Sequence, residues 1–117
     1  MINGNINQFL DTGWYSEATI FYQNFIYWCE ADTDPETGLT HFWVDKWKAV
    51  NEDNKIFHSI ENSKHELEGF EHVFDIRCKS VDSIKKQFLE ARIFNGKSFW
   101  QVEHEIAWLE EGTEIME

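Results

Sequence analysis

Three consecutive residues near the C-terminus, Glu103, His104 and Glu105, bring two carboxylates and an imidazole together. If this segment is a strand, the two glutamates project from one face about 6–7 Å apart, a separation compatible with paired acid–base carboxylates. His104 then shares the opposite face with apolar neighbours: Trp100, Val102, Ile106 and Trp108. Nothing nearby marks a substrate pocket, so a solvated strand face and a core or edge histidine are the simpler interpretations. We predict no catalytic residue here.

Metal and cofactor chemistry is not indicated either. The histidines of HELEGFEH, residues 65–72, lack the HExxH spacing that places two ligands on one helical face. Cys29 and Cys78 have no CxxC spacing and are typical of buried thiols in a reducing cytosol, with a disulfide as the less favoured alternative. The sequence shows no glycine-rich phosphate loop, nucleophile elbow or cysteine–histidine signature. It therefore predicts no metal, no cofactor and no enzymatic activity.

Charge is the most informative property of the chain. Acidic residues number 22 against 10 basic ones, which gives a net charge of −12. All the bases lie in residues 46–97, so residues 1–45 and 98–117 are acidic segments without any lysine or arginine. Such a field repels nucleic-acid phosphates and anionic membranes and attracts basic partners. Plain solubility is the alternative explanation.

Composition and length bound the remaining possibilities. The 117 residues predict a single domain, 1–117, and aromatic residues make up 16% of them. This is more aromatic surface than so small a core needs, so some rings are expected at an interface, with an aromatic-rich core as the alternative. The N-terminus has no signal-peptide pattern, and no apolar run reaches the roughly 20 residues of a membrane helix. We therefore predict a cytoplasmic location.

Strand patterns dominate the first half of the chain. The run at residues 14–30 is aromatic and β-branched and predicts one long strand. A turn with Pro35 and Gly38 follows, and residues 39–50 predict the second strand of a hairpin. Residues 51–69 are undecided between short strand, helix and loop. Residues 70–78 alternate strictly, which predicts a half-buried strand with Phe70, His72, Phe74, Ile76 and Cys78 on one side and Glu71, Asp75 and Arg77 on the other.

One amphipathic helix follows that strand. Ser80 is a suitable N-cap, apolar residues recur at helical spacing through 81–94, and Asn95-Gly96 supplies a stop. Residues 98–109 are open to two interpretations. Ser98 with Gln101 resembles a helical capping box, but a strand would give the strand at 70–78 a partner and is favoured. The predicted fold is α+β: an antiparallel sheet of about four strands, from a long hairpin and a strand–helix–strand unit, with one main helix on one face.

Two segments carry a resemblance. GWYSEATIFY at 13–22 and WLEEGTEIME at 108–117 are similar to the two ends of a family of small uncharacterised bacterial proteins. Members of that family begin with a Trp-Tyr strand and end in an acidic Gly-x-Glu tail. The resemblance favours a strand near the C-terminus and implies no activity.

The functional hypothesis is a small acidic protein-binding domain, of the inhibitor or immunity-protein kind, that blocks a basic partner such as a toxin or nuclease. Electrostatic steering would come from acidic residues, and exposed aromatics would anchor the interface. The predicted binding residues are Asp32, Asp34, Glu36, Trp43, Trp47, Glu103 and Glu105. One alternative is a small-ligand binder or enzyme with an aromatic cleft between sheet and helix, using His72 or His104. Another is a structural or accessory domain. A homodimer through a sheet edge is also compatible with the sequence.

Overall fold

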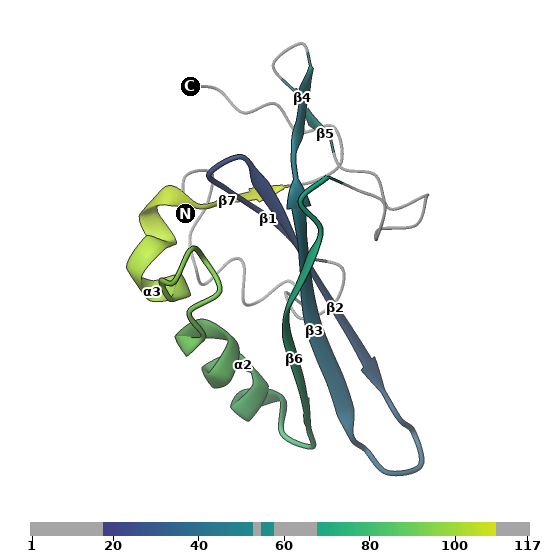
Figure 1. The fold of residues 1–117 in the computed structure, drawn as a ribbon. Coiled ribbons are helices and arrows are strands. Elements are labelled where there is room, and N and C mark those ends of the chain that lie inside the picture. The colour runs from purple at the N-terminus through teal and green to yellow at the C-terminus, as the bar shows by residue number, and fades with distance from the viewer. Residues whose placement is uncertain (1–17, 53–54, 58–67, 110–117) are drawn as a thin grey trace.

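A five-stranded antiparallel sheet organises the protein (Figure 1). The structure is a computed structural model and describes residues 18–52, 55–57 and 68–109. Along the sheet the strands are ordered β6-β3-β2-β1-β7. Their bounds are β1 Ala18–Tyr22, β2 Phe25–Thr33, β3 Thr40–Lys48, β6 Glu71–Cys78 and β7 Ala107–Leu109. A separate two-stranded hairpin pairs β4 Val50–Glu52 with β5 Lys55–Phe57.

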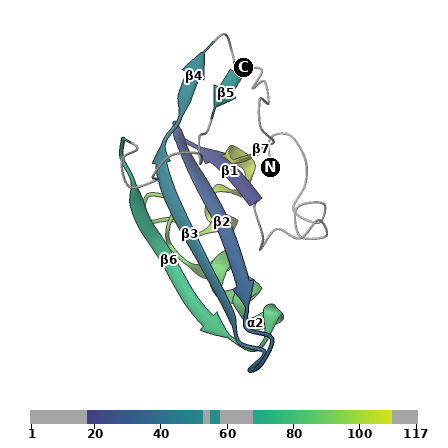
Figure 2. The same cartoon turned by 90° about the vertical axis from the view of Figure 1, so that its right-hand side faces the viewer.

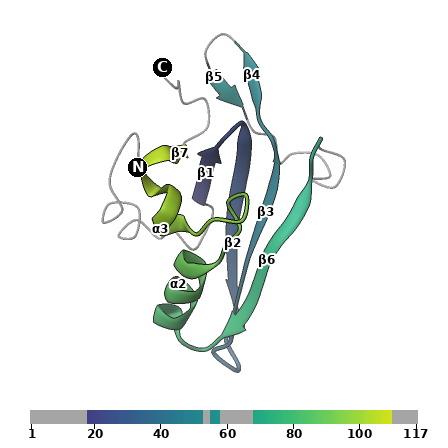
Figure 3. The ribbon, with the colours of Figure 1, turned by 60° about the vertical axis from the view of Figure 1, so that its left-hand side comes forward.

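The helices lie together on one face of the sheet (Figures 2 and 3). They are α2 Val81–Glu90, α3 Phe99–Val102 and the 3₁₀ turn η2 Glu103–Glu105. The predicted antiparallel sheet with a helix on one face is thus confirmed. It has five strands where about four were expected, and the described residues are mostly sheet with few helices, so the predicted α+β class fits only loosely.

The long strand predicted for residues 14–30 is wrong for its described part, because the chain reverses at Gln23-Asn24. Both residues have positive φ, 48° and 70°, and Tyr22 pairs directly with Phe25 across a two-residue turn. Asparagine tolerates this backbone region better than most residues, and consecutive positive φ angles match the right-handed twist of a hairpin. The reversal makes β1 and β2 adjacent strands and accounts for the additional strand.

The hairpin of β2 and β3 agrees with its prediction. Its turn is built around Asp34, whose side-chain Oδ1 accepts a hydrogen bond of 2.8 Å from the backbone N–H of Glu36. The backbone N–H of Gly38 donates to the carbonyl of Asp34 at 2.8 Å, and Gly38 has a φ of 73°. Glycine adopts that φ without the steric cost of a Cβ.

Helix α2 begins as predicted and ends early. The hydroxyl of Ser80 accepts a hydrogen bond of 3.2 Å from the backbone N–H of Ser83, which caps the first turn. The helix ends at Glu90 instead of residue 94. Asn95 and Gly96, with φ of 54° and 80°, form a tight turn between Phe94 and Lys97.

The strand favoured for residues 98–109 is largely wrong. Ser98 and Gln101 form the capping contact that the sequence offered, with the Ser98 backbone N–H donating to Gln101 Oε1 at 2.9 Å. Helix α3 and η2 follow, and only Ala107–Leu109 pairs as a strand, with β1. The capping box therefore specified this segment better than the alternating pattern did. His104 does not lie among apolar neighbours, since its side chain is 74% exposed.

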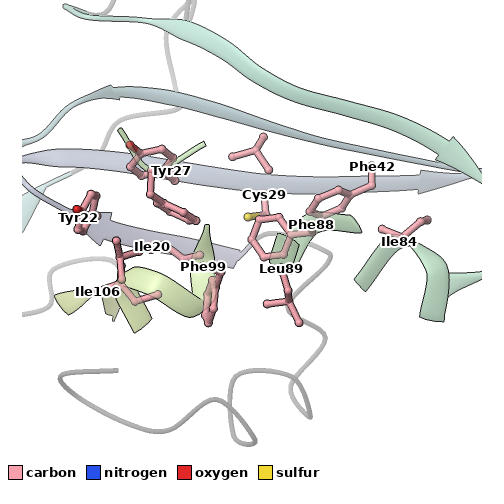
Figure 4. Packing of buried hydrophobic residues seen from close by; sticks show 13 residues of the cluster. Ile20, Tyr22, Tyr27, Cys29, Phe42, Ile84, Phe88, Leu89, Phe99 and Ile106 are labelled. Atoms are coloured by element: carbon pink, nitrogen blue, oxygen red, sulfur yellow. The ribbon is translucent and has the colours of Figure 1, made fainter. Parts of the chain in front are cut away.

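The core fills the space between the sheet and the helices with aromatic rings (Figure 4). Phe42 of β3 contacts Phe88 of α2 with ring centroids 5.4 Å apart, and Phe88 lies 6.0 Å from Phe99 of α3. All three side chains are fully buried. The aromatic content of the sequence is therefore used in large part to build a core, and Cys29 is buried within it.

Candidate functional site: the open face of the sheet

The face of β2, β3 and β6 opposite the helices carries most of the charged side chains of the sheet. None of the described helices lies on it (Figure 2). We call this surface the open face. Cross-strand register arranges it in three rows, each running from β2 through β3 to β6. The rows are Trp28, Asp45 and His72; Glu30, Trp43 and Asp75; and Asp32, His41 and Arg77.

A β-bulge brings His72 to the open face. The register of β3 with β6 shifts between Val44 and Asp45, so Val44 pairs with Phe74 and Asp45 with His72, which leaves Val73 as an additional residue. An extra residue reverses the alternation of side chains beyond it. The prediction that His72 shares the side of Phe74 is therefore wrong. It lies with Asp75, three positions along the same strand.

Two histidines and two aspartates form one continuous hydrogen-bonded network. Nδ1 of His72 lies 2.6 Å from Oδ1 of Asp45, and Nε2 of His72 lies 2.9 Å from Oδ2 of Asp75. The other oxygen of Asp75 lies 2.8 Å from Nε2 of His41. Nη1 of Arg77 is 3.4 Å from that same oxygen. Asp75 therefore links both histidines and an arginine.

The network shifts the acidity of its members. The hydrogen bond to Asp45, followed by that to Asp75, raises the pKa of His72 above its ordinary value, against a smaller opposing effect of burial. Desolvation acts to raise the pKa of Asp75, but the hydrogen bonds from His72 and His41 outweigh it, and that pKa is lowered. Both shifts favour an imidazolium paired with carboxylates.

Aromatic side chains accompany the charges. The ring of Trp43 stacks on that of His41 with centroids 4.5 Å apart and planes inclined by 31°. Trp43 is half-buried, and its position in the row lies between those of Glu30 and Asp75. The indole Nε1 of Trp28 donates to Oε1 of Glu30 at 2.5 Å. The open face thus combines an accessible aromatic with anionic groups.

The predicted binding residues separate into three places. Asp32 and Trp43 lie on the open face, and Asp34 and Glu36 lie in the exposed turn between β2 and β3. Glu103 and Glu105 lie on η2, which stands apart from that turn in Figures 1 and 3. Among these predicted residues, the two glutamates of η2 therefore lie apart from the acids of the open face and of its turn.

Trp47 does not offer an exposed aromatic as predicted. Its side chain is 2% exposed, because it packs with Ile26 and Trp28 in a small cluster on the open-face side of the sheet. A large apolar side chain that is exposed is Trp100 on α3, at 54%. Sequence reasoning missed Trp100 because the strand interpretation placed it in the core.

The alternative hypothesis placed His72 or His104 between the sheet and the helix, but neither histidine lies there. His72 lies on the open face, and His104 is exposed on η2. Within residues 18–52, 55–57 and 68–109 no group of three or more metal-ligating side chains is arranged to hold an ion. His65 of HELEGFEH lies outside the described residues. Cys29 and Cys78 are free thiols.

The comparisons with known proteins identify no relative. No protein-family model matches the chain, and neither a curated protein sequence nor a solved structure matches it at a significant level. None of the described helices has the length and apolar character needed to cross a bilayer.

Proposed function

We propose that the protein is an acidic protein-binding domain, of the inhibitor or immunity-protein kind, whose open face docks onto a basic partner in the cytoplasm. The observation that supports this most directly is the row in which Trp43 stands between Glu30 and Asp75. A half-buried indole bordered by carboxylates suits a lysine or arginine side chain, which is attracted both to the ring face and to the anions.

The turn between β2 and β3 extends the same surface. Asp34 and Glu36 are exposed there, at the end of the strands that carry Asp32 and Trp43. Charges at the rim of an interface act mainly on the association rate, and salt screens them over a Debye length of about 8 Å near physiological ionic strength. A central aromatic acts mainly on the dissociation rate.

The experiment compares two double charge reversals. Asp32→Lys with Glu36→Lys alters the proposed surface, and Glu103→Lys with Glu105→Lys alters η2 and changes the net charge by the same amount. Each immobilised protein is exposed to host lysate at low and high ionic strength, and the retained proteins are quantified by mass spectrometry. We expect a basic protein that the wild type and the η2 variant retain at low salt, and that the open-face variant and Trp43→Ala retain much less.

Two results would contradict the proposal. If only the η2 reversal abolishes retention of the partner, the interface lies at η2 and Trp100 and not on the open face. Equal retention by all four proteins at both ionic strengths would show that the acidic surface has no selective partner in that lysate. Far-ultraviolet circular dichroism of each variant verifies the fold. This check matters most for Trp43→Ala and Glu103→Lys, because both residues are half-buried, whereas substitutions at exposed positions usually change stability by about 0.5 kcal/mol or less.

A further inference from the structure

His72 has a carboxylate oxygen at each of its ring nitrogens. The distances are 2.6 Å from Nδ1 to Asp45 and 2.9 Å from Nε2 to Asp75. An ionised carboxylate only accepts hydrogen bonds, and a neutral imidazole has a single N–H to donate. Both contacts can therefore be hydrogen bonds only while His72 is an imidazolium.

The two carboxylates are held unequally. The side chain of Asp45 is 6% exposed, whereas that of Asp75 is 36% exposed. Loss of one hydrogen bond to an ionised group costs more where water cannot replace the lost donor. When the imidazole has one proton left, the contact to the buried carboxylate is the one to be preserved.

We infer that His72 is a proton-dependent clamp between β3 and β6, which holds Asp45 at all times and releases Asp75 to the open face when it becomes neutral. In the neutral form Nδ1 retains its hydrogen and donates to Asp45. Nε2 then presents a lone pair to Oδ2 of Asp75, and the two acceptors repel each other. Asp75 moves toward His41, Arg77 and water.

Within the described part of the chain, three strands contribute charged or titratable groups near the clamp. Strand β3 contributes Asp45 and His41, β6 contributes Asp75 and Arg77, and β2 contributes Glu30 in the row of Asp75. The next pair along the two strands is Lys46 with Glu71, and Nζ of Lys46 lies 3.6 Å from Oε2 of Glu71. Among these groups, Asp45 and Asp75 are the hydrogen-bond partners of His72.

The consequence for binding rests on the proposed function. Loss of the His72 proton removes one positive charge from the open face and exposes a carboxylate beside Trp43. A basic partner should therefore bind more tightly as the pH rises through the titration of His72. The clamp itself requires no partner, so it is tested on the free protein.

The test is NMR titration of the full chain with isotope-labelled histidine and aspartate. The ¹⁵N shifts of His72 should show a titration midpoint above the ordinary histidine value, and a neutral form protonated on Nδ1. The Cγ shift of Asp75 should follow the same midpoint with a larger change than that of Asp45. Asp45→Asn should lower the His72 midpoint more than Asp75→Asn does, and Glu103→Gln should leave it unchanged.

Several results would overturn the clamp. These are a neutral His72 protonated on Nε2, an Asp75 signal that does not follow the His72 titration, or a midpoint at the ordinary histidine value. All three are read from the wild-type protein, so they hold even if an aspartate variant fails to fold. A confirmed clamp with no basic partner in the lysate experiment would reject the proposed function alone.

Discussion

Nδ1 of His72 lies 2.6 Å from Oδ1 of Asp45, a residue 27 positions earlier in the chain. The contact joins β6 to β3 at the bulge, where the regular register between the two strands is broken. Charge-assisted hydrogen bonds are stronger than those between neutral groups. A side-chain contact therefore reinforces the sheet where its backbone pairing is irregular.

We predict that this network makes stability depend on pH in a defined direction. The pKa of His72 is raised on folding, so its contribution is fully present below the reference value of 6.5 and is lost as the pH rises through the folded pKa. The pKa of Asp75 is lowered, so its contribution is present above the reference value of 3.8 and is lost as the pH falls through the folded pKa. The network should contribute most in the weakly acidic range.

Urea denaturation of the wild type and His72→Gln across this pH range measures the effect. The difference in free energy of unfolding should be largest in weakly acidic solution and should shrink toward alkaline pH. Taking the difference removes the general repulsion of a chain with a net charge of −12. His104→Gln is the control, because His104 is exposed and lies 3.7 Å from Glu105. A pH-independent difference would show that the His72 charge does not stabilise the fold.

A second prediction concerns helix α2. Ile84 is 1% exposed and belongs to the core between α2 and the sheet, so Ile84→Asp places an unpaired carboxylate there. We expect a loss of roughly 4 kcal/mol or more, which is enough to prevent folding of a domain of this size. Gln87→Asp adds the same charge at an exposed position of the same helix and should retain a cooperative thermal transition. An unchanged melting temperature for Ile84→Asp would show that α2 does not pack against the sheet in the core.

A third prediction concerns Tyr27, whose hydroxyl has no hydrogen-bond partner among the described residues. Burial, followed by the charges of Tyr22 and Glu71, raises the pKa of Tyr27 to about 12, so the hydroxyl stays neutral. An unsatisfied buried polar group costs about 1–3 kcal/mol. Tyr27→Phe keeps the ring, which lies 4.7 Å from that of Phe94, and should leave the free energy of unfolding unchanged or raise it.

The matched variant for Tyr27 removes the ring as well. Tyr27→Ala should cost about 3–5 kcal/mol through lost contacts and the cavity left behind. Urea denaturation distinguishes the two substitutions. A loss of stability in Tyr27→Phe comparable to that in Tyr27→Ala would show that the hydroxyl has a partner after all.

Local signals in the sequence predicted those elements that local interactions determine. Ser80 caps α2 because its hydroxyl reaches the N–H of Ser83 within the same turn. The turn after β2 likewise closes through contacts of Asp34 with its near neighbours. Such interactions span only a few residues, so residue type and spacing suffice to predict them.

The errors arose where contacts distant in the sequence decide the outcome. Gln23 and Asn24 lack the glycine that usually marks a tight hairpin, but Asn95 of another turn donates to Gln23 Oε1 at 2.6 Å and supports the reversal. The bulge that turns His72 to the open face depends on the pairing of β6 with β3. The network of the candidate site could not be predicted, because strict alternation along β6 placed His72 and Asp75 on opposite sides.

The last prediction concerns the unequal reactivity of the two thiols. Cys29 is fully buried and burial raises the pKa of its thiol, so it should resist alkylation in the folded protein. Cys78 is partly exposed, and hydrogen bonds from the backbone of Ser80, then from the side chain of Ser83, lower its pKa. Iodoacetamide at neutral pH should therefore modify Cys78 well before Cys29, and mass spectrometry of tryptic peptides measures both rates.

Two controls test the cause of this difference. Ser83→Ala removes one hydrogen-bond donor to Cys78 and should slow its modification. In concentrated guanidinium chloride both cysteines should react alike. Equal rates in the folded protein, or a Cys78 rate unaffected by Ser83→Ala, would show that the start of α2 does not activate this thiol.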